Sequence, residues 1–247
     1  MGLLERTLAR LVRDDGESRL RHLDRAGRRY TYLQIAGEVG RLAPGGRLII
    51  GFHGLGANER QMETLVPMEI PRGSIYLSLR APHERGHEGW SWFDPPMPAD
   101  STPYVDAVAF VAEFVEWAKD MVGVDATRTT LVGYSQAAPL MAAVGQLRPD
   151  LASDLVLASA ALPDEVLALG HGIPHRVFVG VGSKDPLVDH GVLGSLLSQW
   201  TPARQHVQTY DIPHVVSVRE AADIARWIFA DSSVPPSLSH TPVPHAA

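Results

Sequence analysis

Six short segments rich in apolar residues recur along the chain, and they constrain its fold more than any other feature of the sequence. In most of them apolar residues follow one another directly, without the alternation of apolar and polar residues expected of a strand with one face in water. Strands buried on both faces, as in a parallel sheet, have this pattern. The six segments are 48–52, 75–79, 130–134, 155–158, 177–181 and 207–212.

Helical patterns separate these segments. Apolar residues recur there every three or four positions, as on the buried face of a helix. This spacing predicts helices at 103–122, 136–147, 187–200 and 216–230. Strands that alternate with helices predict an α/β protein with a doubly wound, mostly parallel sheet.

The first 46 residues have a different pattern. Residues 3–13 predict a short amphipathic helix. Segments 19–23 and 29–35 predict the two arms of a hairpin around a turn at 24–27. With both arms included, the predicted sheet has eight strands.

We predict one domain over residues 1–230, because no internal repeat and no linker divides this part of the chain. Residues 231–247 are rich in Ser, Pro, His and Ala and lack periodicity, so we predict a disordered tail there. His240 and His245 form a poor metal site because both lie in this tail.

Composition excludes several functional classes. The 28 acidic residues outnumber the 22 basic ones, and the resulting net charge of −6 argues against a nucleic-acid-binding protein. The absence of cysteine excludes disulfides, thiolate zinc sites and cysteine nucleophiles. No segment has the ~18 apolar residues of a membrane span, and the first residues lack the apolar core of a secretory signal, so we expect a cytoplasmic protein. No glycine-rich phosphate loop occurs, so we expect no nucleotide cofactor.

The segment around Ser135 carries the clearest chemical motif. An apolar strand runs into Gly133-Tyr-Ser135-Gln-Ala137, and an apolar helix follows. This is the context of a nucleophile elbow, a strained strand-to-helix turn that exposes a serine hydroxyl. Small residues two positions before and after the serine allow the close backbone contact of that turn. The alternative is an ordinary serine at a helix N-terminus.

Two partners for Ser135 follow later strands of the predicted sheet. Asp185 and His214 each come directly after an apolar strand, in the chain order serine, acid, histidine that this architecture uses. In such a triad His214 would be the general base toward Ser135, and Asp185 would hold the imidazole tautomer. Asp189 is the rival acid.

A glycine-rich turn after the strand at 48–52 completes the predicted machinery. In His53-Gly-Leu55-Gly-Ala-Asn58 the glycines allow a backbone N–H to face a tetrahedral intermediate. An oxyanion hole needs one donor from this turn and one from the residue after the nucleophile. We therefore predict the N–H groups of Leu55 and Gln136 as its donors. A tight turn without a ligand is the alternative.

The segment from His83 to His87 matches the H-E-x-x-H pattern of zinc proteases. That pattern requires a helix, and the proline and glycine residues in and around it disfavour one. We predict a loop here and no metal. The aromatic residues that follow would either wall an acyl pocket or pack the loop down. They are Trp90, Trp92 and Phe93.

Together these motifs resemble the phospholipase/carboxylesterase family of α/β-hydrolases, which includes bacterial carboxylesterases and acyl-protein thioesterases. The similar segments span most of the chain from about residue 47 to 230, and the family's elbow is typically G-F-S-Q-G-G, from which Ala137 and Ala138 depart. The similar segments are FHGLGAN (52–58), APHERGHEGWSWFD (81–94), VGYSQAA (132–138), VGSKDPLVD (181–189) and the Pro-His pair at 213–214.

The resemblance implies the α/β-hydrolase fold and the same triad and oxyanion donors that the residues themselves predict. The connection at about 160–175 is too short for a large cap domain. We therefore expect a cofactor-free serine hydrolase that cleaves small-molecule carboxylic esters with small to medium acyl groups. Thioesterase, lysophospholipase, acyltransferase or peptidase activity on the same triad is an alternative. So are a metallopeptidase and a non-catalytic binding protein with the same fold.

Overall fold

The computed structural model describes most of the chain between residues 18 and 230. Two predicted segments, the helix at 3–13 and the tail at 231–247, lie outside the described residues. So do half of the predicted helix at 187–200 and most of the connection at 160–175 beyond residue 163. The described residues are 18–37, 42–65, 70, 73–94, 102–163, 166, 169, 176–191, 193–194 and 204–230.

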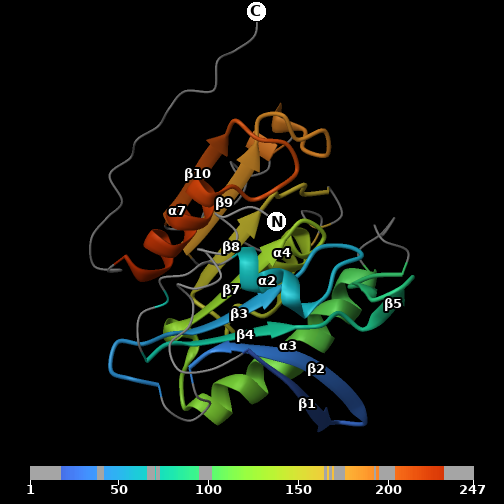
Figure 1. The fold of residues 1–247 in the computed structure, drawn as a ribbon, viewed down its shortest axis with the longest axis vertical. Coiled ribbons are helices and arrows are strands. Elements are labelled where there is room, and N and C mark those ends of the chain that lie inside the picture. Colours follow the sequence, from blue (N-terminus) through green and yellow to red (C-terminus); the bar gives the residue numbers. More distant parts are fainter. Residues whose placement is uncertain are drawn as a thin grey trace, which may run out of the picture.

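An eight-stranded sheet forms the centre of the molecule, in the strand order β1-β2-β4-β3-β7-β8-β9-β10 (Figure 1). The β1–β2 and β2–β4 pairs are antiparallel, and all the other neighbours pair in parallel. The predicted eight-stranded, mostly parallel sheet is therefore confirmed. The strands are β1 (Arg19–Arg25), β2 (Arg28–Ala36), β3 (Leu48–Phe52), β4 (Ile75–Leu79), β7 (Thr129–Tyr134), β8 (Asp154–Ala158), β9 (Arg176–Gly182) and β10 (Arg204–Tyr210).

The last strand differs from its prediction. β10 begins at Arg204 and ends at Tyr210, whereas the sequence predicted a strand at 207–212. Its register explains the difference, because Arg204 pairs with Arg176, the first residue of β9. The first residues of β10 are polar, so no apolar pattern predicts them, but they pair with β9 and therefore belong to the strand.

Helices cover both faces of this sheet (Figure 1). The helices α3 (Thr102–Val122) and α4 (Ala137–Leu147) pack on one face, and α2 (Met62–Leu65) and α7 (Val218–Phe229) contribute to the core on the other. Alternate strand residues enter the two cores because successive side chains of a strand point to opposite faces. In β3, for example, Ile50 belongs to the first core and Ile49 to the second. There are also two short 3-10 helices, η1 (Glu59–Gln61) and η2 (Ala126–Arg128).

A second, two-stranded sheet lies in the segment that the sequence predicted to be a loop. Its strands are β5 (His83–Arg85) and β6 (Gly89–Ser91), which pair antiparallel across a tight turn. In that turn Gly86 has φ +59° and Glu88 has φ +64°. The loop prediction was wrong in this detail, but the prediction of a non-helical segment is confirmed. The H-E-x-x-H string therefore runs from a strand into a turn, so its two histidines share no helix face.

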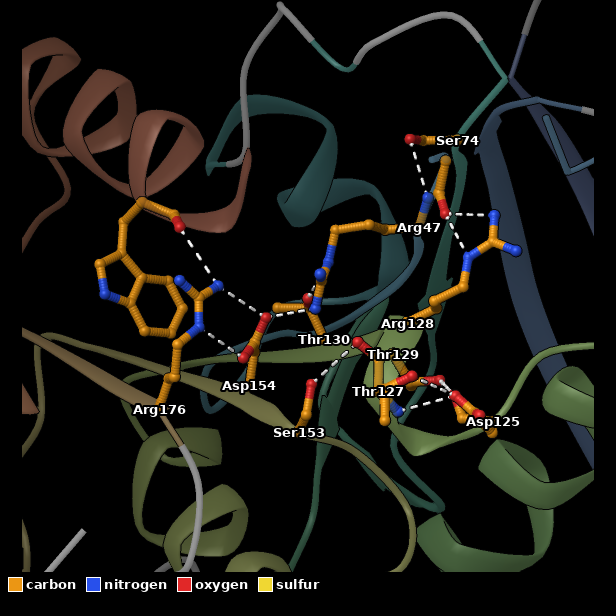
Figure 2. A network of polar contacts seen from close by, with 12 residues as sticks. Arg47, Ser74, Asp125, Thr127, Arg128, Thr129, Thr130, Ser153, Asp154 and Arg176 are labelled. Carbon is orange, nitrogen blue, oxygen red and sulfur yellow. Dashed lines mark hydrogen bonds and ion pairs between the residues drawn. The ribbon is translucent and has the colours of Figure 1, made fainter. Parts of the chain in front are cut away.

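A buried ion-pair network joins the parallel strands at the edge where they begin (Figure 2). Asp154, the first residue of β8, is 2% exposed and accepts two hydrogen bonds from the Arg176 guanidinium, at 2.9 and 2.8 Å. Arg47, directly before β3, donates to the same carboxylate. Arg176 also stacks over the ring of Trp227 in α7, with 4.6 Å from its guanidinium carbon to the ring centroid. One buried carboxylate thus ties β3, β8, β9 and α7 together.

Replacing Asp154 tests how much this network contributes to the free energy of unfolding. We expect Asp154→Asn to lower the free energy of unfolding by about 3–5 kcal/mol, because two largely buried guanidinium groups lose their counter-charge. Urea denaturation measures the change. The matched control is Asp24→Asn, which breaks an exposed pair with Arg29 and should leave the urea midpoint unchanged. Equal midpoints for Asp154→Asn and the parent protein would contradict this account of the edge.

Candidate active site

The turn between β7 and α4 has the geometry of a nucleophile elbow. Ser135, the first residue after β7, has φ +54°, a left-handed conformation that is strained for a residue other than glycine. Its N–H donates to Ala158 O at 3.0 Å, and its carbonyl accepts from Ala138 N–H at 2.9 Å. A Cβ added at Gly133 would lie 2.4 Å from Ala137 O, so the turn requires glycine at that position. Ala137 itself is fully buried, and its methyl group is part of the core.

Three predicted side chains meet above this turn. His214 Nε2 lies 2.7 Å from Ser135 Oγ, and His214 Nδ1 lies 2.6 Å from Asp185 Oδ2. With the Nδ1–H tautomer, the imidazole donates to the carboxylate and accepts from the serine hydroxyl. The arrangement can therefore remove a proton from the Ser135 hydroxyl while a carboxylate fixes the ring.

Asp185, rather than Asp189, is the carboxylate in contact with His214. The Asp185 side chain is fully buried, and its other oxygen accepts the Leu187 N–H at 2.9 Å. Asp189 Oδ1 accepts the Gly191 N–H at 2.9 Å, and the Asp189 carbonyl accepts from Leu193 N–H at 2.8 Å. Asp189 thus caps a local turn.

Direct backbone contacts hold two loops against each other. One follows β9 and carries Asp185, and the other, the histidine loop, follows β10 and carries His214. Ser183 N–H donates to Tyr210 O at 2.7 Å, and Lys184 N–H donates to Ile212 O at 3.1 Å. A Cβ at Gly182 would lie 2.2 Å from Ile212 O, so only glycine allows the two loops to approach this closely. The position of Asp185 relative to His214 therefore follows from the ends of two adjacent strands.

The glycine-rich turn after β3 is anchored through His53. This side chain is fully buried, accepts from Ala81 N–H at 3.1 Å through Nε2, and contacts Gly54 O at 2.8 Å through Nδ1. Burial lowers the pKa of His53 to about 4, so the imidazole is neutral at pH 7 and the Nδ1–H tautomer satisfies both contacts. Trp92 Nε1–H donates to the His53 carbonyl at 2.7 Å.

The two predicted oxyanion donors lie on either side of Ser135 in the sequence. Leu55 lies in the turn that His53 anchors, and this residue is 46% exposed. Within the described chain the Leu55 N–H has no hydrogen-bond partner. Gln136 follows Ser135 directly, and its buried side chain is held because Oε1 accepts from Trp92 N–H at 3.1 Å. Their role in holding an oxyanion stays a prediction.

The three aromatic residues predicted to wall a pocket divide into two groups. Trp92 and Phe93 are each 1% exposed and belong to the core, where the Phe93 ring packs at an angle against that of Tyr104 with 4.6 Å between ring centroids. Their burial fits the alternative stated above, in which they pack the segment down. Trp90 instead lines a shallow hollow, where the Arg80 guanidinium carbon lies 4.9 Å from its ring centroid. Neither Ser135 nor its two partners line this hollow.

Sequence reasoning missed a buried carboxyl group beneath the histidine loop. Glu220 is 1% exposed in the first turn of α7, and neither of its carboxyl oxygens makes a hydrogen bond of normal geometry within the described chain. A Cβ at Gly180 would lie 2.2 Å from Glu220 Oε1, so the carboxyl group occupies the space that this glycine leaves open. The Ser217-x-x-Glu220 spacing of a capping box could have revealed it, and Ser217 Oγ indeed accepts from Glu220 N–H at 3.1 Å.

Comparison with known proteins identifies the fold. No family model and no curated protein matches the sequence. Among solved structures, a carboxylesterase from Mesorhizobium loti is similar, with a TM-score of 0.65 and 19% identity, covering 82% of this chain and 95% of that chain. The Bacillus cereus carboxylesterase has a TM-score of 0.63 and 17% identity, covering 81% and 92% of the two chains. An α/β-hydrolase fold protein from Chitinophaga pinensis has a TM-score of 0.62 and 14% identity, covering 87% and 98%.

At these identities the likeness establishes the fold alone. The chain has the α/β-hydrolase fold, as its motifs predicted. Within the described ranges, no three or more His, Cys, Asp or Glu side chains gather so as to hold a metal ion. No helix in those same ranges combines the length and apolar character that crossing a membrane requires.

Glu220 gives the protein a defined pH dependence of stability. Burial raises its pKa to about 7, the Ser217 N–H opposes this, and the nearby Asp223 carboxylate adds to it. Tyr134 and Tyr210, the other titratable side chains near it, stay protonated because burial raises their pKa values. Between pH 4.5 and 7 the folded carboxyl keeps its proton while the unfolded one loses it, so this group's contribution to stability falls as the pH rises.

We therefore expect Glu220→Gln to stabilise the fold at pH 8 and to have little effect at pH 5. Urea denaturation at both values measures the difference between the variant and the parent. Glu84→Gln, on exposed β5, is the control and should show no pH-dependent difference. A Glu220→Gln difference that is the same at pH 5 and pH 8 would show that Glu220 ionises normally.

Proposed function

We propose that this protein is a serine hydrolase that cleaves carboxylic esters with small to medium acyl groups, and that it belongs with the phospholipase/carboxylesterase family. The observation that carries the proposal is the chain of contacts from Ser135 Oγ through His214 to Asp185, at 2.7 and 2.6 Å. The strained backbone at Ser135 and the fold support it as well. A non-catalytic binding protein would not need these two contacts together.

Acylation begins at the hydroxyl of Ser135. Its oxygen attacks the ester carbonyl as His214 Nε2 takes its proton, which gives a tetrahedral intermediate with a negatively charged oxygen. The N–H groups of Leu55 and Gln136 are the proposed donors to that oxygen, at ~3 kcal/mol of transition-state stabilisation each. The carbon–oxygen bond to the leaving alcohol then breaks, and the alcohol takes the proton from His214.

Deacylation repeats this chemistry with water. His214 takes a proton from a water molecule, whose oxygen attacks the acyl carbon. The bond from that carbon to Ser135 Oγ breaks, the free acid leaves, and the proton returns to the serine. Through both halves Asp185 stabilises the imidazolium and holds the ring orientation. A thioester would follow the same steps with a thiol as leaving group.

Hydrolysis of p-nitrophenyl esters with acyl chains of two to twelve carbons tests the proposal. We expect activity in the parent protein, highest for the shorter chains, and a loss of at least ~10³-fold in Ser135→Ala and in His214→Ala. His83→Ala is the matched histidine control and should retain full activity, also in the presence of a chelator. A folded but inactive parent protein, or an active Ser135→Ala, would refute the proposed function.

The assignment of the acid has its own test. Asp185→Asn should lower kcat by about 10³- to 10⁴-fold, because the amide no longer supports the imidazolium and favours the wrong tautomer. Asp189→Asn should change kcat less than about three-fold, because Asp189 caps a local turn. Steady-state kinetics of the two variants side by side give the answer. A larger loss in Asp189→Asn would reverse the assignment.

A further inference from the structure

The hydroxyl group of Tyr134 contacts the backbone of the histidine loop. Tyr134 ends β7, directly before Ser135, and its hydroxyl donates to His214 O at 3.1 Å. Burial and the Asp185 carboxylate raise the pKa of Tyr134, so the hydroxyl is protonated and available as a donor at neutral pH. Its ring lies beside the His214 imidazole, with 5.8 Å between ring centroids.

The same tyrosine also touches the turn that holds the predicted oxyanion donor. A Cβ added at Gly54 would lie 3.0 Å from Tyr134 Cδ1, so the ring packs against the bare backbone of that turn. Tyr134 is 9% exposed. One buried ring therefore contacts the glycine-rich turn that contains Leu55 on one side and the loop of His214 on the other.

A second hydroxyl group holds the next residue of the histidine loop. Ser159 follows β8 as Ser135 follows β7, and its Oγ donates to Val215 O at 3.4 Å. Ser159 is 1% exposed and has φ +48°. Of the four non-glycine residues with positive φ among those described, two lie in hairpin turns and the other two are Ser135 and Ser159. Strain that persists at a buried serine points to a role for its side chain.

We propose that Tyr134 and Ser159 are positioning residues, which hold the backbone carbonyls of His214 and Val215 and thereby keep the imidazole in line with Ser135. This inference rests on the proposed function, because it concerns the same triad. The hydrogen bond that the imidazole donates to Asp185 and the one that it accepts from Ser135 orient the ring of His214, but they do not hold its backbone. The two hydroxyl groups supply that constraint from the ends of β7 and β8.

Tyr134→Phe removes one hydroxyl group and keeps the packed ring. We expect kcat to fall about 3- to 10-fold, the range that the loss of one net hydrogen bond allows, while KM changes less than two-fold. Ser159→Ala should show the same pattern with a smaller loss, because its hydrogen bond is longer. The readout is kcat and KM for a p-nitrophenyl ester, with the urea midpoint measured in parallel.

Tyr76→Phe is the matched control. Its fully buried hydroxyl also donates to a backbone carbonyl, Met62 O at 2.8 Å, but it contacts no triad residue. We expect this variant to lower the urea midpoint and to leave kcat unchanged. A Tyr134→Phe variant that loses stability but keeps the parent kcat would overturn the proposal, because the hydroxyl would then be only structural.

A second measurement does not depend on turnover. The short contact between His214 Nδ1 and Asp185 should give a low-field proton NMR signal, which His214→Ala lacks. We expect this proton to exchange faster with water in Tyr134→Phe than in the parent protein, and at the parent rate in Tyr76→Phe. An unchanged rate in Tyr134→Phe would overturn the positioning role. An inactive parent protein would refute the proposed function alone, because the exchange measurement still decides the role of Tyr134.

Discussion

The parallel pairing of six neighbouring strands is the constraint on which the rest of this molecule depends. Because parallel strands end at one edge of a sheet, the turns after β7, β9 and β10 are brought together although they are far apart in the sequence. Ser135, Asp185 and His214 each lie in one of these turns. At the opposite edge, the buried Asp154 carboxylate forms ion pairs with Arg47 and Arg176. The buried ion pairs of Asp154 thus lie at the edge where the parallel strands begin, and the candidate triad lies at the edge where they end.

Close backbone contacts set the positions of the site residues within this topology. Glycines at 133 and 182 let the chain pass where a methyl group would collide with a carbonyl oxygen. The strained serines at the ends of β7 and β8 have different proposed roles, since Ser135 faces the reacting atoms and Ser159 holds the histidine loop. The side chains of the candidate site are therefore positioned mainly by backbone geometry. The exposed Lys184–Asp211 ion pair between the two loops adds little, because solvent screens it.

Much of this arrangement could be predicted from the sequence, because buried parallel strands leave a continuous apolar signal. The strands at 48–52 and 75–79 were predicted to the residue, and the three side chains that meet were each predicted from their position after a strand. Strands with polar residues carried no such signal, so β5 and β6 were missed and β10 was displaced. The contact between the Tyr134 hydroxyl and the His214 carbonyl joins residues 80 positions apart and depends on the exact fit of two loops. No local pattern encodes such a contact.

Covalent labelling tests most directly whether Ser135 is an activated nucleophile. A fluorophosphonate probe should phosphonylate the folded protein once, with a bond from Ser135 Oγ to phosphorus and loss of fluoride, and tandem mass spectrometry should locate the label at Ser135. His214→Ala should slow labelling by orders of magnitude, because no base would then take the serine proton. A folded protein that stays unlabelled, or one labelled at another residue, would contradict the account.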